Sequence, residues 1–470
     1  MSFMNCEKLL EGFEPDFEFV PPMAIPEEEF YDRIAHIRRE ATIGEHDVTL
    51  INTNGSKNFH TSNKYLRYAC DWNREGILII PTDSSKGLQL FSFYTQAVLL
   101  PPSWGEAVGV EKLYQVGALG REYSGRQASS DEKLVEGVTK VLTDLGYNNA
   151  SIGIIGDDTS GKYWNALKEM LPKAKFVNET HVILDMQRLR TKNEIDQIRA
   201  SAQLMDIGFQ AACHACKPGV TDWELYAAFS FAQLARGGEN ADGYQIGVNK
   251  WGTHIGKAYG HTIVPGDLIN FYVSGISYRG YTAQAARMIA VGDITPKQEE
   301  VLEICAESLR RAEKVIKPGV PICDINKAGF SIFIEKGYIK DDITATMPYN
   351  WAPNDDLSAI EIPLQYVENV DIERYGRKLM HVYPPQASPA IGPHNPNLGH
   401  GIGMHGNPTK FNVTSHNTDI CQPGLAFVLH PQWTEAMVAG ANIGNCYVVT
   451  EDGYENLTCH TPIETIRIKA

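Results

Sequence analysis

Short apolar runs alternate with amphipathic segments over residues 27–185. Four of the runs have the length and composition of buried strands, and the longer stretches between them carry apolar residues at helical spacing. This alternation predicts an α/β domain around a largely buried sheet. The predicted strands are residues 48–53, 76–81, 88–93 and 151–156, and the clearest helices are residues 27–44 and 131–146. Residues 1–26, which are rich in proline, glutamate and phenylalanine, predict an extended arm.

A second domain is predicted over residues 186–470, and it begins with a long amphipathic helix. Thr191 and Glu194 have the spacing of a capping box at the start of that helix. The sequence Lys-Pro-Gly-Val occurs at 217–220 and again at 317–320, each time between two predicted helices. Two such units predict a duplicated α/β half, with strands from both halves in one sheet. For residues 343–393, rich in proline and aromatic residues, we predict a lid or binding loop.

The composition indicates a globular chain with an acidic surface. The formal net charge is −15 and hydrophobic residues make up 43% of the chain. Strong negative charge disfavours nucleic acid and anionic membranes as partners, and it favours a cationic or zwitterionic small molecule. The start of the chain lacks a signal-peptide pattern, no continuous apolar run is long enough for a membrane span, and the nine cysteines are scattered. These features favour a cytoplasmic protein with reduced thiols.

A collinear series of motifs runs through the second domain. The most specific are RLRTKNEIDQIR at 188–199, PGDLINFYVSGISYRGYTAQAAR at 265–287, LGHGIGMHG at 398–406, PGLAFVLHP at 423–431 and VVTEDGYENLT at 448–458. With these motifs the chain resembles the creatinase/aminopeptidase superfamily (pita-bread fold, peptidase M24-like). Its two-domain layout is similar to that of creatinase and prolidase.

The resemblance implies a fold of the α/β (α+β) class. A smaller α/β domain at 27–185 would precede a pita-bread domain at 186–470, in which pseudo-duplicated halves surround a curved antiparallel sheet. The resemblance also implies a homodimer.

Most of the metal ligands that the resemblance implies are replaced in this chain. The two aspartate positions hold Val273 and Gln284, the two glutamate positions hold His430 and Gly444, and only His400 is kept. Hard divalent cations need anionic oxygen ligands, so we predict no two-metal site and no metal cofactor. A single transition metal on histidines is the alternative, because zinc, copper and nickel accept imidazole ligands.

Creatinase resembles this situation, since it hydrolyses a C–N bond without metal and uses a histidine as proton shuttle. The run from Gly247 to His254 matches the surroundings of that histidine, so the resemblance implies this role for His254. Creatine itself is not expected as substrate, because Ala286 and His430 replace the glutamates that bind its guanidinium. We predict a metal-independent, creatinase-like hydrolase or lyase that cleaves a C–N bond of a small polar metabolite, with His254, His430 and His400 as catalytic residues.

Substrate binding is predicted for neutral and aromatic side chains in the same motifs. Gln284 stands where an acid is normally found, and its amide suits a substrate amide or carboxylate. Arg287 could pair with a substrate carboxylate, with an internal salt bridge as the alternative, and His405 is a weaker candidate. Tyr281 and Trp251 belong to a set of aromatic residues that fits either an alkylammonium cage or simple packing. The others in this set are Tyr349, Trp351 and Trp433.

Two further functions are compatible with the sequence. One is an M24-like metalloenzyme, an Xaa-Pro peptidase or a lyase, with rewired histidine-rich ligands. The other is a non-catalytic pita-bread binding protein, which the retained histidines and the absence of acidic low-complexity tails disfavour. The matched strands carry no obvious carboxylate or thiol nucleophile, and Cys446 and Tyr281 are the nearest candidates.

Overall fold

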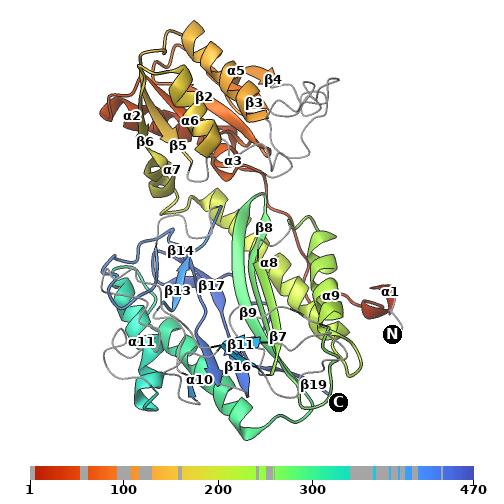
Figure 1. Cartoon of the computed structure of the whole chain (residues 1–470). Coiled ribbons are helices and arrows are strands. Elements are labelled where there is room, and N and C mark those ends of the chain that lie inside the picture. The colour runs from red at the N-terminus through yellow and green to blue at the C-terminus, as the bar shows by residue number, and fades with distance from the viewer. Residues whose placement is uncertain are drawn as a thin grey trace. The chain divides into compact units, whose positions relative to one another are not determined.

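The computed structural model of the chain contains two compact units, each with its own helices and sheets (Figure 1). One unit is Met23–Arg188, and the other combines Met1–Pro22 with Leu189–Ala470. No helix among the described residues is both long and apolar enough to cross a bilayer. The structure describes residues 6–52, 62–92, 107–115, 130–156, 161–239, 243–249, 258, 260–338, 364–366, 380–382, 390–391, 397–404, 411–435 and 438–470.

The unit Met23–Arg188 is built around a six-stranded mixed sheet with the strand order β4–β3–β2–β1–β5–β6. Strand β2 is antiparallel to both of its neighbours, and the other adjacent pairs are parallel. The predicted alternation of strands and helices is confirmed. The strands are β1 (Val48–Ile51), β2 (Gly76–Pro81), β3 (Leu88–Ser92), β4 (Val110–Gln115), β5 (Ser151–Ile155) and β6 (Lys175–Asn178). The helices are α2 (Glu27–Ile43), α3 (Lys64–Cys70), α5 (Ser130–Asp144), α6 (Gly161–Met170) and α7 (Thr180–Met186).

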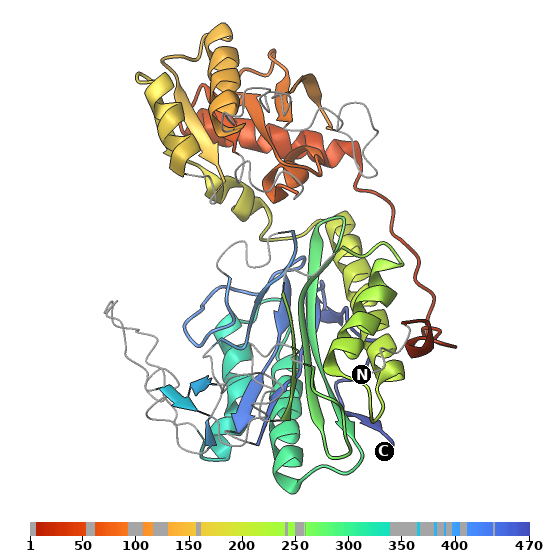
Figure 2. The same ribbon diagram turned by 45° about the vertical axis from the view of Figure 1, so that its right-hand side comes forward.

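The larger unit has two halves, each with a pair of helices and a four-stranded sheet (Figures 1 and 2). All strand pairs in these two sheets are antiparallel except the parallel pair of β19 and β9. An isolated bridge between Ala286 and Gly444 joins the two sheets. The first half contains α8 (Lys192–Ala215), α9 (Asp222–Leu234), β7 (Gly243–Val248), β8 (Leu268–Tyr278) and β9 (Tyr281–Val291), with β19 (Ile466–Ile468) beside β9. The second half contains α10 (Pro296–Glu313), α11 (Ile322–Glu335), β13 (Gly399–Gly401), β14 (Ala426–Leu429), β17 (Asn445–Val449) and β18 (Tyr454–Asn456).

Short strands complete the second half. β15 (Gln432–Glu435) pairs with β16 (Ala439–Asn442) and with β12 (Ala390–Ile391), and β10 (Leu364–Tyr366) pairs with β11 (Met380–Val382). The segment predicted as a lid, residues 343–393, lies outside the described residues apart from β10, β11 and β12.

The repeated Lys-Pro-Gly-Val sequence forms the same structure twice. In the first copy Gly219 donates to the carbonyl of Ile263, and in the second Gly319 donates to that of Cys421. Both glycines have positive φ, +96° and +85°, which glycine adopts without steric strain and which lets the chain turn between two helices. The predicted duplication is confirmed, and so is the capping box of Thr191. The strands of the two halves form separate sheets joined by the bridge between Ala286 and Gly444, where one shared sheet was predicted.

The hairpin β8–β9 presents two chemically different faces. Opposed residues of an antiparallel pair share a face, and successive residues alternate between faces. The register places Tyr272 and Gln284 on one face. The opposite face carries Phe271 and Arg287 and packs on α8, where the Phe209 ring lies 5.8 Å from that of Phe271. The face that carries Tyr272 and Gln284 is therefore turned away from α8.

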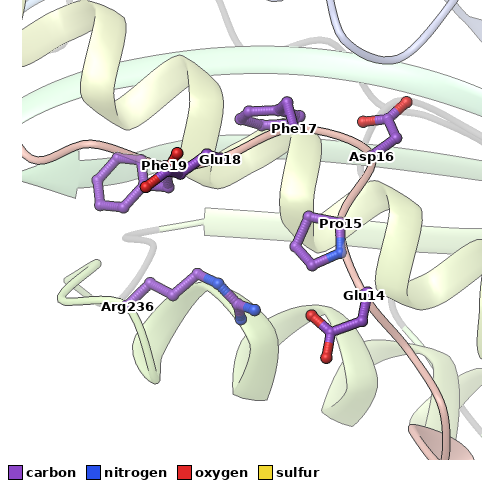
Figure 3. A pocket seen from close by; sticks show the side chains of 7 residues that line it. All are labelled: Glu14, Pro15, Asp16, Phe17, Glu18, Phe19 and Arg236. Atoms are coloured by element: carbon purple, nitrogen blue, oxygen red, sulfur yellow. The ribbon is translucent and has the colours of Figure 1, made fainter.

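Residues 10–19 of the N-terminal arm pack on the larger unit and run beside α9 (Figure 2). Their apolar side chains contact Ile207 and Ala211 of α8 and Ala232 of α9. The Phe17 ring also stacks on His460, with 3.7 Å between ring centroids. The arm and Arg236, which follows the end of α9, border a surface pocket of about 460 Å³ (Figure 3). Its lining residues are Glu14, Pro15, Asp16, Phe17, Glu18, Phe19 and Arg236.

We expect Phe17→Ala to lower the free energy of unfolding of the larger unit by about 1–2 kcal/mol, because a half-buried aromatic ring loses its contacts. Val20→Ala is the control in the same arm, since Val20 is 67% exposed. Denaturant unfolding followed by fluorescence measures both. Equal stability of the two variants would contradict the docking of the arm.

Candidate functional site

Four side chains lie close together in the larger unit. Three of them belong to strands β8, β9 and β13, and the fourth directly follows β14. The His430 ring lies between two others, with 5.2 Å between its centroid and that of His400 and 5.8 Å to that of Tyr272. Gln284 donates from Nε2 to the phenol oxygen of Tyr272. We call the side of the strands that carries these four residues the site face. The structure thus brings together His400, His430 and Gln284 of the predicted site residues.

The strand register explains why these residues share a face. His400 of β13 stands opposite Val428 of β14, so it lies on the same side as His430, which follows that strand at an even spacing. The backbone N–H of His430 donates to the carbonyl of Leu398, which fixes its position. The bridge between Ala286 and Gly444 then holds this sheet against β9, which carries Gln284.

The hydrogen bond of His400 defines its tautomer. Nδ1 lies 3.0 Å from the carbonyl oxygen of Gly401, and a carbonyl oxygen can only accept. In the neutral ring the proton is therefore on Nδ1, and Nε2 carries the lone pair. An imidazole held in this way can take a proton or bind a metal through Nε2.

Tyr272 is a hydrogen-bonding group that sequence analysis missed. Its side chain is 5% exposed, and burial raises the pKa of the phenol above its ordinary value. The group therefore stays a protonated phenol, which can donate a hydrogen bond to a substrate oxygen. Strand alternation could have identified it, because pairing Ser274 with Gln284 puts Tyr272 on the same face as Gln284.

Three predicted site residues, His254, Trp251 and His405, lie outside the described residues, and their roles stay predictions. The same holds for Tyr349 and Trp351. Trp433 is described and is a packing residue, since its ring stacks on Phe333 of α11 with 5.3 Å between centroids.

The predicted substrate-binding role of Tyr281 is wrong. Tyr281 lies on the α8 face of β9, the same face as Arg287, because both have odd positions in one strand. Its phenol donates to Glu194 near the start of α8, at 3.2 Å, and its side chain is 2% exposed. Tyr281 therefore anchors α8 to the hairpin and does not face the histidines.

The predicted role of Arg287 in binding a substrate carboxylate is also wrong. The side chain is fully buried on the α8 face, and its nitrogens donate to backbone carbonyls of Gly444, Thr458 and Thr461 and to the side chain of Asn445. Asp206 of α8 lies 3.9 Å away. Burial lowers the pKa of Arg287, and the Asp206 carboxylate opposes that shift. Arg287 therefore forms an internal ion pair with Asp206, which was the alternative prediction.

We expect Arg287→Met to destabilise the protein by about 3–5 kcal/mol, because it leaves several buried carbonyls without their donor and the buried Asp206 carboxylate without its counter-ion. The matched control is Arg467→Met, which removes an exposed ion pair with Glu299 and should cost less than about 1 kcal/mol. Chemical denaturation measures both variants. A stable Arg287→Met protein that had lost only ligand binding would contradict the structural role.

Cys446 lies on the site face, but its thiol stays protonated and is therefore not a nucleophile. Its Sγ donates to the backbone carbonyl of Gln284 at 2.8 Å, and burial raises the pKa of the thiol to about 12. The reactive form of cysteine is the thiolate, which this site suppresses near neutral pH.

Thiol labelling tests this protonation state. At pH 8 we expect iodoacetamide to modify the exposed Cys459 in the folded protein, and to modify Cys446 only after unfolding. Peptide mass spectrometry measures the two rates. Comparable rates in the folded protein would show that Cys446 is accessible and ionised.

Comparison with known proteins places this arrangement in a family. The model of the metallopeptidase family M24 matches residues 196–451, more than half of the chain. The chain belongs to the M24 metallopeptidase family. An Xaa-Pro dipeptidase of Lactobacillus helveticus is 23% identical over 312 residues, which cover 65% of this chain and 69% of that protein.

Solved structures show the same fold. The Xaa-Pro dipeptidase from Bacillus anthracis superposes with a TM-score of 0.66 at 20% identity, covering 93% of this chain and 100% of that one. The prolidase from Pyrococcus horikoshii gives a TM-score of 0.65 at 18% identity, covering 93% and 99%. The predicted pita-bread superfamily and fold class are confirmed.

The donor set of this M24 member does not fit a pair of hard cations. Val273 is fully buried and faces α8, Gly444 has no side chain, and Gln284 supplies a neutral amide engaged with Tyr272. Among the described residues no three histidine, cysteine, aspartate or glutamate side chains are grouped as metal ligands would be. Two divalent cations need several carboxylates, which these positions lack.

Proposed function

We propose that this protein hydrolyses the C–N bond of a small peptide-like substrate on its site face. Membership of the M24 family and the likeness to Xaa-Pro dipeptidases support hydrolysis of such a bond. The observation that carries the proposal is the adjacent pair of imidazoles, His400 and His430, at 5.2 Å between centroids. They stand at family ligand positions and beside two neutral hydrogen-bonding groups.

In this proposal each described side chain has a separate task. His400 takes a proton from the attacking water at Nε2, since Nδ1–H is held by the Gly401 carbonyl. His430 returns a proton to the leaving nitrogen. The Tyr272 phenol, oriented by Gln284, donates to the oxygen on which negative charge develops. The predicted proton shuttle His254 would join this set from outside the described residues.

A second candidate is an M24-type hydrolase that uses one transition metal on His400 and His430. The description of the family as metallopeptidases favours it, and a metal-binding histidine commonly donates its other N–H to a carbonyl, as His400 does. The described residues supply two such ligands, so further ones would have to come from other parts of the chain.

The test of the function is a hydrolysis assay on the whole chain with Xaa-Pro dipeptides, other dipeptides and their amides, read out by mass spectrometry. We expect His400→Ala and His430→Ala to lower kcat by about 10²–10⁴-fold, which is typical for the loss of a general acid or base. His416→Ala is the control, because His416 is exposed and its neighbour Asn417 bonds to the start of α11. Turnover that survives in both site variants would overturn the proposal.

Metal analysis separates the two candidates. Without a catalytic metal, the purified protein should contain substoichiometric zinc, copper, nickel and iron, and chelator treatment should leave its turnover unchanged. Loss of turnover with a chelator and recovery with one transition metal would establish the second candidate. The homodimer and the cytoplasmic location stay predictions, and light scattering on the purified protein tests the first.

A further inference from the structure

Two buried amide side chains stand opposite each other on neighbouring strands. Gln432 of β15 and Asn442 of β16 are register partners, and they are 4% and 0% exposed. Neither polar atom of either side chain has a hydrogen-bond partner within the described part of the chain. Buried amides are normally paired, so four such atoms at one place need an explanation.

The strand pattern turns both amides toward the site face. Their neighbours Trp433 and Ala441 point into the core formed with α10 and α11, and successive residues of a strand alternate between faces. Gln432 therefore lies on the side of His430, two residues earlier in the chain. Asn442 precedes Gly444 by two residues, and a Cβ at Gly444 would lie 2.8 Å from the Cβ of His430.

The energetic cost of these amides indicates a ligand. A buried amide without a partner loses its hydrogen bonds to water and gains none in return, whereas leucine or methionine in its place would avoid this loss. Gln245 of β7 is the register partner of Tyr272 and therefore lies on the same face. Its buried amide oxygen is a third one without a partner among the described residues. Three amides around one face suit a group that both donates and accepts.

We propose that Gln432 and Asn442 form a subsite for an uncharged amide group of the substrate, such as a carboxamide or a peptide bond. A side-chain amide offers a donor and an acceptor side by side, which matches another amide. The strands β8, β9, β15 and β16 place no lysine, arginine or carboxylate on this face, so a charged group beside the two amides would lose its hydration without an opposite charge. The identification of this ligand as the substrate rests on the proposed function.

The position of the pair sets the place of the amide in the substrate. Two strand residues span about 6–7 Å, so Gln432 lies roughly that far along the strand from His430. An extended peptide covers a similar length in two residues. The bond cleaved at His430 and the recognised amide are therefore about one to two residues apart.

A binding experiment tests the recognition. Glycylprolinamide and glycylproline are titrated by calorimetry into the His400→Ala protein, in which turnover is suppressed. We expect the amide to bind at least about 10-fold more tightly than the carboxylate, and we expect Gln432→Met or Asn442→Leu to abolish the difference. Equal or tighter binding of the carboxylate would overturn the proposal, while the hydrolysis assay above judges the proposed function separately.

Thermal stability gives a readout that needs neither turnover nor ligand. Gln432→Met and Asn442→Leu should each raise Tm by about 2–4 °C, because a buried amide that has no partner among the described residues is replaced by an apolar side chain of similar size. Gln298→Met is the matched control and should lower Tm, since Gln298 is buried and bonded to Thr295 and Asn249. Site variants that are destabilised like the control would show that the amides serve the fold, and the proposal would fail.

Discussion

One buried guanidinium determines how the two halves of the larger unit meet. Arg287 leaves β9 on the α8 face and binds carbonyls at Gly444, Thr458 and Thr461, so a single side chain ties β9 to the start of β17 and to the loop after β18. Its position also fixes strand register, because moving Arg287 by one residue would turn Gln284 away from the histidines. The geometry of the site face thus depends on a residue that does not line it.

The site face differs from a metal-binding cleft in its electrostatics. Its described members are imidazoles, a phenol, a thiol and amides, none of which carries a fixed charge of the kind that holds a divalent cation. In such surroundings a transition state is stabilised by oriented dipoles and not by a bound cation. The same neutrality limits which substrates bind well, since an ion would enter without a counter-ion.

Much of the fold could be predicted from sequence because its signals are local. The alternation of strands and helices, the Thr191 capping box and the repeated Lys-Pro-Gly-Val turn each depend on a few neighbouring residues. The site was predictable only in part. Motif positions identified His400, His430 and Gln284, but Arg287 and Tyr281 were assigned to the site on motif membership alone, although their odd positions in β9 put them on the face opposite to Gln284. The strand pairing that places Gln432 opposite Asn442 on the site face leaves no local signature.

The docking of the arm has a consequence for how the chain is made. Residues 10–19 rest on α8 and α9, yet Met23–Arg188 is translated between them and their docking surface. At ordinary rates of synthesis the arm waits about 10–40 s for that surface to appear. During this interval its phenylalanines are not yet buried against α8 and α9, which leaves them accessible to nascent-chain chaperones.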